Sequence, residues 1–377
     1  MTVSDYRPPL RDDLAGQTPY GAPQLDIDVR LNVNENPFPP PDAVIDAVTA
    51  EVRRIMAEAN RYPDRDFAEL RRVLADYLSR EAQVRVTADQ IWAANGSNEV
   101  MAHVMAAFGG PGRVALTFPP TYSMYPEYAR ESFTDLVTVP RRADFTIDVR
   151  LATEAIREHR PSIVLVASPN NPTGTAIALS DIASLSTACL SVNGVLVVDE
   201  AYAEFRRSGV PSALELIDDH PNLIVTRTMS KAFAMAGVRL GYAVARPTVV
   251  DALRIVRLPY HLSSITQAVA RAAIVHADEL QAGLEILRSE RDALVQALRM
   301  RGLRVADSDA NFCMFGEFVD RHAMWQGLVG RGVLIRETGP QAWLRVSVGT
   351  PHENARFVAA LDEVMAELGQ GALVVDE

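Results

Sequence analysis

Residues 223–242 read LIVTRTMSKAFAMAGVRLGY, an apolar run followed by a polar turn that carries Lys231. The apolar run, residues 223–225, is typical of a buried parallel strand. A lysine just beyond such a strand favours Schiff-base chemistry with a carbonyl compound. The alternative is an ordinary solvated lysine, which is the commoner fate of a Ser-Lys pair met alone. The residues upstream decide between the two interpretations.

An acid ends the apolar run that precedes this one in the chain. Residues 195–198 read VLVV and are followed by Asp199. At the carboxyl end of a parallel strand, an acid points into the crevice where open α/β sheets bind ligands. Asp199 could simply cap the following helix. It could also keep the ring nitrogen of a pyridoxal cofactor protonated, so that the ring acts as an electron sink.

A third apolar run leads into a sharp loop. Residues 162–167 read SIVLVA and continue as SPNNPTG, residues 168–174. The Ser-Pro, Asn-Pro and Thr-Gly steps predict a turn at the end of this strand. From that position Asn171 could donate a hydrogen bond to the phenolic oxygen of the same ring.

A Gly-Ser turn opens a helix earlier in the chain, where residues 93–99 read AANGSNE. The free backbone N–H groups and the helix dipole behind Gly96 and Ser97 suit a phosphate group. The alternative is a plain N-cap by Ser97, with Glu99 in the first turn. Neither a nucleotide P-loop nor a dinucleotide-binding fingerprint is present to compete for the phosphate role.

Taken together, in this order and on these strand ends, the motifs resemble the fold-type I pyridoxal-phosphate aminotransferases of class I/II over nearly the whole chain. The resemblance implies that Lys231 forms the Schiff base with the cofactor, pyridoxal 5'-phosphate, and that Asp199 pairs with the ring nitrogen. It also implies that Asn171 and Tyr202 bind the phenolic oxygen. The residues implied to hold the phosphate are Gly96, Ser97, Asn98, Ser230 and Arg239.

An aromatic residue follows another expected strand, in FPPTYSMY, residues 118–125. Tyr122 in this segment matches the residue that stacks on the cofactor ring in the same enzymes. A lone tyrosine after a strand could also be ordinary core.

Three further stretches, LNVNENP (31–37), NRYPD (60–64) and WLRVSVGT (343–350), resemble the histidinol-phosphate aminotransferase family. That resemblance implies transamination between histidinol phosphate and 2-oxoglutarate, giving imidazole-acetol phosphate and glutamate, in histidine biosynthesis. Arg345 matches an arginine that grips a substrate carboxylate, and a guanidinium suits carboxylate and phosphate alike. Arg336 would add a second cation for a dianionic phosphate, although it could instead form a surface ion pair with Glu337.

The same resemblance implies a homodimer with shared active sites, in which Tyr62 reaches the cofactor phosphate of the other subunit. Tyr20 and Asn34 match positions near the substrate, so the N-terminal arm would close over the site as a lid. Tyr260 is expected to line the substrate pocket. An arm rich in proline could equally be simple packing.

One departure from the family concerns residues 337–344, a segment shorter than in many members. Since loop length at the edge of a site can retune specificity, the reaction is better supported than the substrate. The rivals on the same fold are an aromatic-amino-acid aminotransferase and a threonine-phosphate decarboxylase. A cofactor-sensing regulator would need a DNA-binding module, for which the arm before Asn34 is too short. A degenerate homologue is disfavoured because the matching polar positions hold the expected residue types.

Length and composition fit this interpretation. With 377 residues, 48% of them hydrophobic and 23% charged, the chain can form two domains. Strands alternating with helices predict an α/β fold, with a large, mostly parallel sheet flanked by helices and a smaller α+β domain. The expected division is an N-terminal arm at 1–40 that joins the small domain, a large cofactor-binding domain at 41–255 and a small domain at 256–377.

The remaining features exclude other classes. A net charge of −11 argues against nucleic-acid binding, and no apolar run is long enough for a membrane span. The first residues lack a signal-peptide pattern. Two cysteines, Cys189 and Cys313, form no disulfide framework and suit the cytoplasm. No paired-histidine motif supports a metal.

Overall fold

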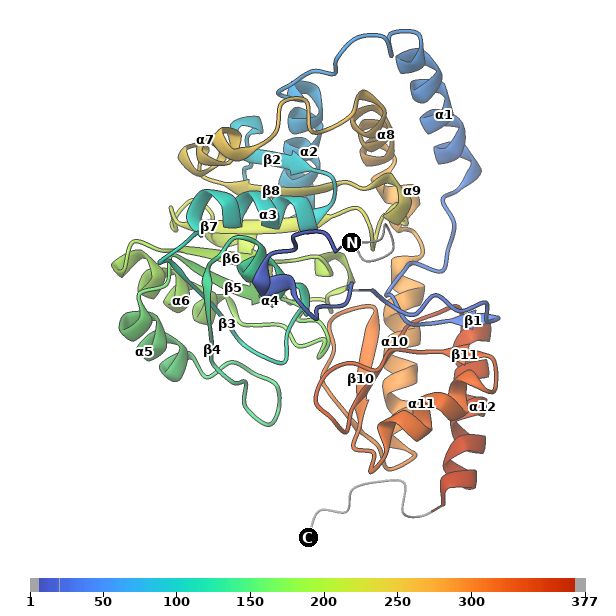
Figure 1. Ribbon diagram of the computed structural model, residues 1–377. Coiled ribbons are helices and arrows are strands. Elements are labelled where there is room, and N and C mark those ends of the chain that lie inside the picture. The colour runs from blue at the N-terminus through green and yellow to red at the C-terminus, as the bar shows by residue number, and fades with distance from the viewer. Residues whose placement is uncertain (1–6, 20, 370–377) are drawn as a thin grey trace.

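A seven-stranded sheet forms the centre of the larger part of the molecule. The computed structural model describes residues 7–19 and 21–369. In sheet order the strands are β2 (Ile91–Ala94), β8 (Gly241–Ala245), β7 (Leu223–Thr228), β6 (Val195–Asp199), β5 (Ile163–Ala167), β3 (Val114–Thr117) and β4 (Asp135–Thr138). Strand β8 runs antiparallel to both of its neighbours, and the other pairings are parallel. The predicted α/β fold with a mostly parallel sheet is therefore confirmed (Figure 1).

Helices pack against this sheet and against one another. They are α1 (Asp42–Met56), α2 (Ala68–Glu81), α3 (Ser97–Phe108), α4 (Met124–Glu131), α5 (Val149–His159), α6 (Leu179–Ser191), α7 (Pro247–Val256), α8 (Ser264–Val275) and α9 (Ala277–Gln281). Strands β5 to β8 are almost entirely buried, as continuous apolar runs in a parallel sheet require. In α2 one apolar face, including Leu70, Leu74 and Leu78, lies inside the core.

The C-terminal part forms a smaller α+β unit. Its sheet places β10 (Phe312–Gly316) between β12 (Leu344–Ser347) and β9 (Arg304–Val305), all antiparallel. Helices α10 (Leu284–Arg299), α11 (Arg321–Val329) and α12 (Pro351–Leu368) surround it. The short strand β1 (Val29–Arg30) of the N-terminal arm pairs in parallel with β11 (Val333–Leu334), so the arm lies against this smaller unit (Figure 1).

Two hydrophobic clusters meet within helix α10. Leu284 and Leu287 belong to the cluster of the large sheet, whereas Leu294 and Leu298 belong to that of the smaller unit. Helix α8 also packs on α1 and α2, within the larger cluster. We therefore propose that the domains divide inside α10, about 35 residues beyond the boundary expected at residue 255.

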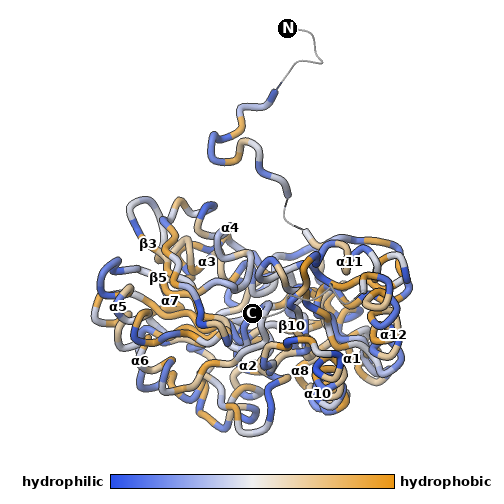
Figure 2. The backbone as a smooth tube through the Cα atoms, turned by 90° about the horizontal axis from the view of Figure 1, so that it is seen from below, coloured by the Kyte–Doolittle hydropathy of each residue, from blue (hydrophilic) through white to orange (hydrophobic). Residues whose placement is uncertain are grey.

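The start of the N-terminal arm projects from the body of the molecule and contacts it at Phe133. Residues 7–19 extend outward from the body (Figure 2), where the Arg11 guanidinium lies 4.4 Å from the centre of the Phe133 ring. Tyr20 lies outside the described residues. Across residues 7–19 and 21–369, no helix combines the length and apolarity needed to cross a bilayer. Nor do these ranges contain a group of three or more His, Cys, Asp or Glu side chains suited to a metal ion.

Candidate active site

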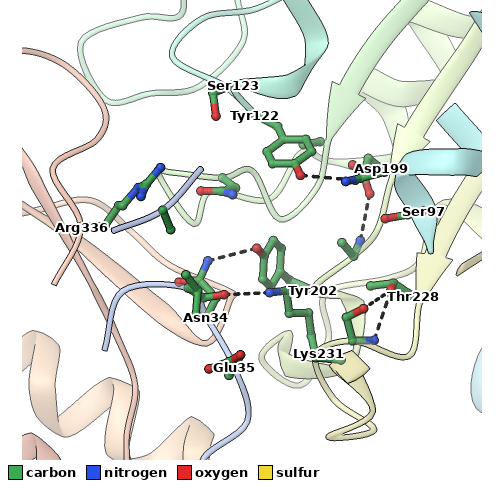
Figure 3. A pocket seen from close by; sticks show the side chains of 18 of the residues that line it. Asn34, Glu35, Ser97, Tyr122, Ser123, Asp199, Tyr202, Thr228, Lys231 and Arg336 are labelled. Carbon is green, nitrogen blue, oxygen red and sulfur yellow. Dashed lines mark hydrogen bonds between the residues drawn. The ribbon is translucent and has the colours of Figure 1, made fainter. Parts of the chain in front are cut away.

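A cavity opens at the carboxyl ends of β5, β6 and β7. Loops that follow these strands form one wall, and the arm at residues 32–35 together with Arg336 and Arg345 forms the other (Figure 3). Its volume of about 310 Å³ is in the range of small-molecule and cofactor sites. The expected site residues that it brings together are Asn34, Ser97, Asn98, Tyr122, Asn171, Asp199, Tyr202, Ser230, Lys231, Arg239, Arg336 and Arg345.

Lys231 projects into this cavity from the turn after β7. Its Nζ donates a hydrogen bond to the carbonyl oxygen of Val33 in the arm, at 2.9 Å. Burial lowers the pKa of Lys231 to about 8; the charges of Arg345 and Arg239 act in the same direction, and Glu35 opposes them. At mildly basic pH a large fraction of this amine is therefore neutral, which is the form that attacks a carbonyl carbon.

The composition of the chain contains a second signal for Lys231, independent of the motif around it. Lys231 is the only lysine among the 37 lysine and arginine residues of the chain. A guanidinium stays protonated and cannot form a Schiff base, whereas a lysine amine can lose its proton. Because arginine fills every other cationic position, the single lysine indicates that Lys231 has a function that arginine cannot perform.

Asp199 ends β6 and is buried. Its Oδ1 accepts hydrogen bonds from the backbone N–H of Ala201 at 3.2 Å and the hydroxyl of Thr226 at 3.3 Å, and its Oδ2 accepts one from Tyr125 at 3.3 Å. Burial raises the pKa of Asp199 to about 6, against the effect of these three bonds. The contact with Ala201 is a local turn bond and not the helix cap considered as an alternative, because the short helix that follows, Ala203–Phe205, has Tyr202 at its N-cap and no side-chain capping bond. All three donors are neutral, so they leave the negative charge of the carboxylate uncompensated. A protonated ring nitrogen would supply the compensating positive charge.

The next acid in the sequence, Glu200, forms an ion pair outside the cavity lining. Its carboxylate lies 2.8 Å from the guanidinium of Arg227, and both side chains are buried. Arg227 also pairs with Glu204 at 3.0 Å and Glu81 at 3.2 Å. Because successive side chains at a strand end point to opposite faces, Asp199 and not Glu200 lines the cavity.

Tyr202 and Asn171 each contact a residue from the arm or the smaller unit. The side-chain amide of Asn34 donates to the Tyr202 hydroxyl at 3.0 Å. Arg345 donates to Oδ1 of Asn171 and, at 2.8 Å, to the carbonyl oxygen of Asn32. With its oxygen engaged by Arg345, Asn171 directs its NH₂ group to other acceptors, as a donor to a phenolic oxygen must.

The N-terminus of α3, where a phosphate-binding site is expected, lies at the cavity. Gly96 takes the N-cap position with φ 86°, and no side chain caps the helix, so Ser97 is its first residue and not its cap. A Cβ at Gly96 would lie 2.6 Å from the Arg239 guanidinium, and one at Gly241 would lie 2.0 Å from the backbone nitrogen of Ser97. The lack of side chains at Gly96 and Gly241 therefore allows the N-terminus of α3, strand β8 and Arg239 to lie close together. Ser230 lies beside them.

Tyr122 stands on the cavity wall and is half-buried. Its hydroxyl donates to Oδ1 of Asn98 at 3.3 Å, and its ring packs edge-on against Tyr125 at 5.7 Å. The ring is thus exposed to the cavity, as stacking on a planar ligand requires, and is not ordinary core.

Arg336 and Arg345 face each other across a hairpin. Their backbones exchange two hydrogen bonds of 3.0 Å each, so the segment 337–344 forms the turn between them. Residues directly opposite in an antiparallel pair project to the same side. The short segment noted in the sequence therefore places both guanidinium groups on the wall of one cavity.

Two expected site residues lie outside this cavity lining. Tyr62 and Tyr260 stack on each other with ring centres 4.5 Å apart, and they are 80% and 41% exposed. Their expected roles stay predictions, as does that of Tyr20. Gly96 acts behind the wall through its backbone.

The cavity is also lined by polar residues for which the sequence predicts no role, namely Asn32, Glu35, Thr121, Ser123, Thr228 and Thr338. Thr228 ends β7 as Asp199 ends β6, so the strand-end rule that found Asp199 could have found it. Glu35 belongs to the quoted segment LNVNENP, but nothing in its spacing distinguished it. Thr338 could be placed only once the hairpin was known.

Comparison with known proteins gives one family. The family model described as aminotransferase class I and II matches residues 26–361. A curated relative from Burkholderia lata, named histidinol-phosphate aminotransferase 3, is 58% identical over 366 residues, which is 97% of this chain and 98% of the relative. A histidinol-phosphate aminotransferase from Thermobifida fusca is 57% identical over 353 residues, 94% of each chain.

Solved structures agree with these relatives. The histidinol-phosphate aminotransferase from Sinorhizobium meliloti, in complex with pyridoxal-5'-phosphate, superposes with a TM-score of 0.80 at 25% identity, covering 91% of this chain and 92% of that one. A second structure, titled a putative histidinol-phosphate aminotransferase from Erwinia carotovora, gives a TM-score of 0.80 at 28% identity, covering 93% and 99%.

Proposed function

Since the chain belongs to the class I and II aminotransferase family, we propose that it transfers the amino group of L-histidinol phosphate to 2-oxoglutarate, with pyridoxal 5'-phosphate as cofactor. The products are imidazole-acetol phosphate and glutamate, in a step of histidine biosynthesis. The observation that carries the proposal is the group of near-full-length relatives at 50–58% identity that bear the name histidinol-phosphate aminotransferase.

The residues of the cavity fit this cofactor. When bound, pyridoxal phosphate supplies an aldehyde that condenses with amines and a ring that accepts an electron pair. We assign Lys231 to the aldehyde carbon, Asp199 to the ring nitrogen, and Asn171 and Tyr202 to the phenolic oxygen. Tyr122 would cover the ring face. The α3 N-terminus with Ser97, Asn98, Ser230 and Arg239 would hold the phosphate.

Lys231 has two tasks in this mechanism. Its neutral amine would hold the cofactor until the amine of the substrate takes its place. The released Nζ would then be free to accept a proton from the substrate carbon and to donate one in return. The lowered pKa of Lys231, about 8, suits a group that must both accept and donate a proton near neutral pH.

The arginine pair accounts for two anionic substrates. Arg345 offers a guanidinium fork to the carboxylate of glutamate or 2-oxoglutarate. A phosphate carries nearly two negative charges at neutral pH, and Arg336 on the same side of the hairpin supplies a second cation. The net charge of −11 does not oppose this, because the cavity wall itself is lined by Arg239, Arg336 and Arg345.

The test is a visible absorption spectrum of the protein loaded with pyridoxal phosphate. L-histidinol phosphate should convert the cofactor to its amine form, and 2-oxoglutarate should restore the starting spectrum. Phenylalanine and threonine phosphate, run in parallel, should convert it far more slowly. If glutamate converts the cofactor but histidinol phosphate does not, the reaction class survives and the substrate is wrong.

We further propose that the active unit is a homodimer in which Tyr62 completes the phosphate site of the partner. In support, Tyr260, which stacks on Tyr62, closely follows two strongly exposed apolar residues in the sequence, Ile255 at 83% and Leu258 at 75%. Exposed apolar groups of this kind mark protein contacts.

The free, buried thiols of Cys189 and Cys313 suit the reducing cytoplasm that we propose as the location.

Mixing two inactive variants tests the shared site. Lys231→Ala and Tyr62→Ala should each be impaired alone. A mixed dimer has one site in which both residues are intact, so remixed subunits should regain about one quarter of the parent activity. Light scattering should give the mass of two chains. Failure of the mixture to gain activity would exclude the action of Tyr62 across a dimer.

A further inference from the structure

Ser347 and Asn34 contact the hydroxyl of Tyr202 in series, from the smaller unit to the cofactor wall. We propose that they form a positioning relay, which aims the hydroxyl hydrogen of Tyr202 at the phenolic oxygen of the bound cofactor. The inference rests on the proposed function, because it requires pyridoxal phosphate in the cavity. It changes the expected role of Asn34 from a substrate contact to a positioning residue.

The hydrogen bonds fix which end of the Asn34 carboxamide faces Tyr202. The backbone N–H of Asn34 donates to Oγ of Ser347 at 2.9 Å, and Oγ in turn donates to Oδ1 of Asn34 at 2.8 Å. Ser347 has one hydroxyl hydrogen, and this geometry directs it to Asn34. The other end of the carboxamide is therefore NH₂, which lies 3.0 Å from the Tyr202 oxygen.

The direction of the Tyr202 hydroxyl follows from this assignment. An amide NH₂ group donates and does not accept, so the Tyr202 oxygen is the acceptor in this contact. The hydroxyl hydrogen of Tyr202 consequently points away from Asn34. Tyr202 lines the cavity, and Nζ of Lys231 lies 5.9 Å from the centre of its ring.

Packing holds the relay in place. Asn34 is 1% exposed and adopts the left-handed conformation with φ 56°, which asparagine tolerates better than most residues. Its carbonyl oxygen accepts a hydrogen bond from the amide of Asn311 at 3.1 Å. Ser347 on β12 is paired with Phe312 on β10, and the Phe312 ring packs edge-on against the Tyr202 ring at 5.0 Å. The same strand pair therefore fixes both ends of the relay.

The relay has a spectroscopic consequence. A hydrogen bond donated to the phenolic oxygen stabilises its negative charge, so that oxygen holds the proton shared with the lysine-bound nitrogen less tightly. The donated bond is strengthened when Tyr202 itself accepts from Asn34. Loss of the relay should therefore raise the pH at which the cofactor chromophore loses its proton.

The experiment is a pH titration of the visible absorption of the cofactor-loaded protein. Ser347→Ala should raise the midpoint by about half a pH unit, the scale of one hydrogen bond. Asn34→Asp should raise it further, by about one unit, because a carboxylate accepts the Tyr202 hydrogen and turns it away from the cavity. Ser347→Thr keeps the hydroxyl and should restore the parent midpoint.

Ser186→Ala is the matched control. Ser186 is also buried and also donates to an asparagine side-chain oxygen, that of Asn222 at 2.9 Å, but it lies outside the cavity lining. Its midpoint should equal that of the parent. If Ser347→Ala fails to fold, Asn34→Asp tests the relay at its other member.

The outcomes separate the relay from the proposed function. Unchanged midpoints in folded, cofactor-loaded Ser347→Ala and Asn34→Asp would overturn the relay and leave the aminotransferase proposal intact. A shift in Ser186→Ala as large as that in Ser347→Ala would also overturn it, since loss of any buried serine would then suffice. A parent protein that forms no chromophore with pyridoxal phosphate would overturn both proposals.

Discussion

Replacing Lys231 by alanine is expected to lower kcat for transamination by at least about 10⁴-fold, because the same amine holds the cofactor and moves the proton. The chain has no second lysine that could take over either task. The variant should still bind pyridoxal phosphate through the α3 N-terminus and Asp199. Activity and cofactor content, measured on the same sample, check both parts of this expectation.

Two controls define the cause of the loss. Lys231→Arg keeps the positive charge but not a titratable amine, so it should be as inactive as the alanine variant. Arg150→Ala removes an exposed cation paired with Glu154 on α5 and should behave like the parent. Borohydride reduction of the loaded parent should attach the cofactor to a single peptide, the one that contains Lys231. Near-normal turnover by Lys231→Ala would exclude the mechanism.

The pH dependence of the parent should follow the same amine. A base acts in its neutral form, so the rate of proton transfer should rise with pH through the pKa of Lys231, about 8 in the cofactor-free protein. Single-turnover measurements across this range would report the value in the loaded enzyme.

Asp199→Asn is expected to lower kcat by about 10²–10³-fold, because the variant cannot hold the ring nitrogen in its cationic form and electron withdrawal weakens. The loss should appear mainly in kcat and not in KM, since Asp199 has no contact with substrate in this assignment. Tyr125→Phe removes one of the three hydrogen bonds to the same carboxylate and should lose far less. A loss in KM alone would contradict the role at the ring nitrogen.

The same variant should be more stable than the parent in cofactor-free protein at high pH. The folded-state pKa of Asp199, about 6, lies above its unfolded value of 3.8. Between these values the folded state binds more protons than the unfolded state, so the free energy of unfolding falls as pH rises. The full cost above pH 6 is roughly 3 kcal/mol from burying the carboxylate.

Thermal unfolding of both cofactor-free proteins at pH 5 and pH 8 measures this cost. The advantage of Asp199→Asn should grow between the two values, and pyridoxal phosphate should stabilise the parent more than the variant. If the parent is the more stable protein at pH 8, the buried Asp199 carboxylate does not destabilise the cofactor-free protein, and there is no such cost for the cofactor to offset.

The buried strands and the location of the site could be predicted because both depend on local patterns. Residues 163–167, 195–199 and 223–228 are buried strands, as their apolar runs indicated, and the polar residues that follow them meet at one sheet edge. Asn171, Asp199 and Lys231 were found for this reason. The family resemblance added the functional role of each.

Contacts between distant segments could not be predicted from such patterns. The pairing of Arg345 with Asn171, and of Ser347 with Asn34, joins residues more than 170 positions apart. Their formation depends on the register of β10 and β12 and on the path of the arm. For the same reason the sequence showed that residues 337–344 are short, but not that they form a hairpin. The amphipathic pattern of residues 264–275 likewise does not show which domain that helix joins, whereas in the structure it packs on α1 and α2.

Helix α10 has a mechanical consequence for substrate binding. Its first half is fixed in one hydrophobic cluster and its second half in the other, while Phe312 of β10 packs in the cluster of the large sheet. A rigid swing of the smaller unit would have to bend this helix or expose these side chains, at a cost of several kcal/mol. The packing of both clusters therefore holds the wall that carries Arg345 against Asn171. Binding then loses little free energy to ordering the enzyme, and selectivity is set by a preformed shape.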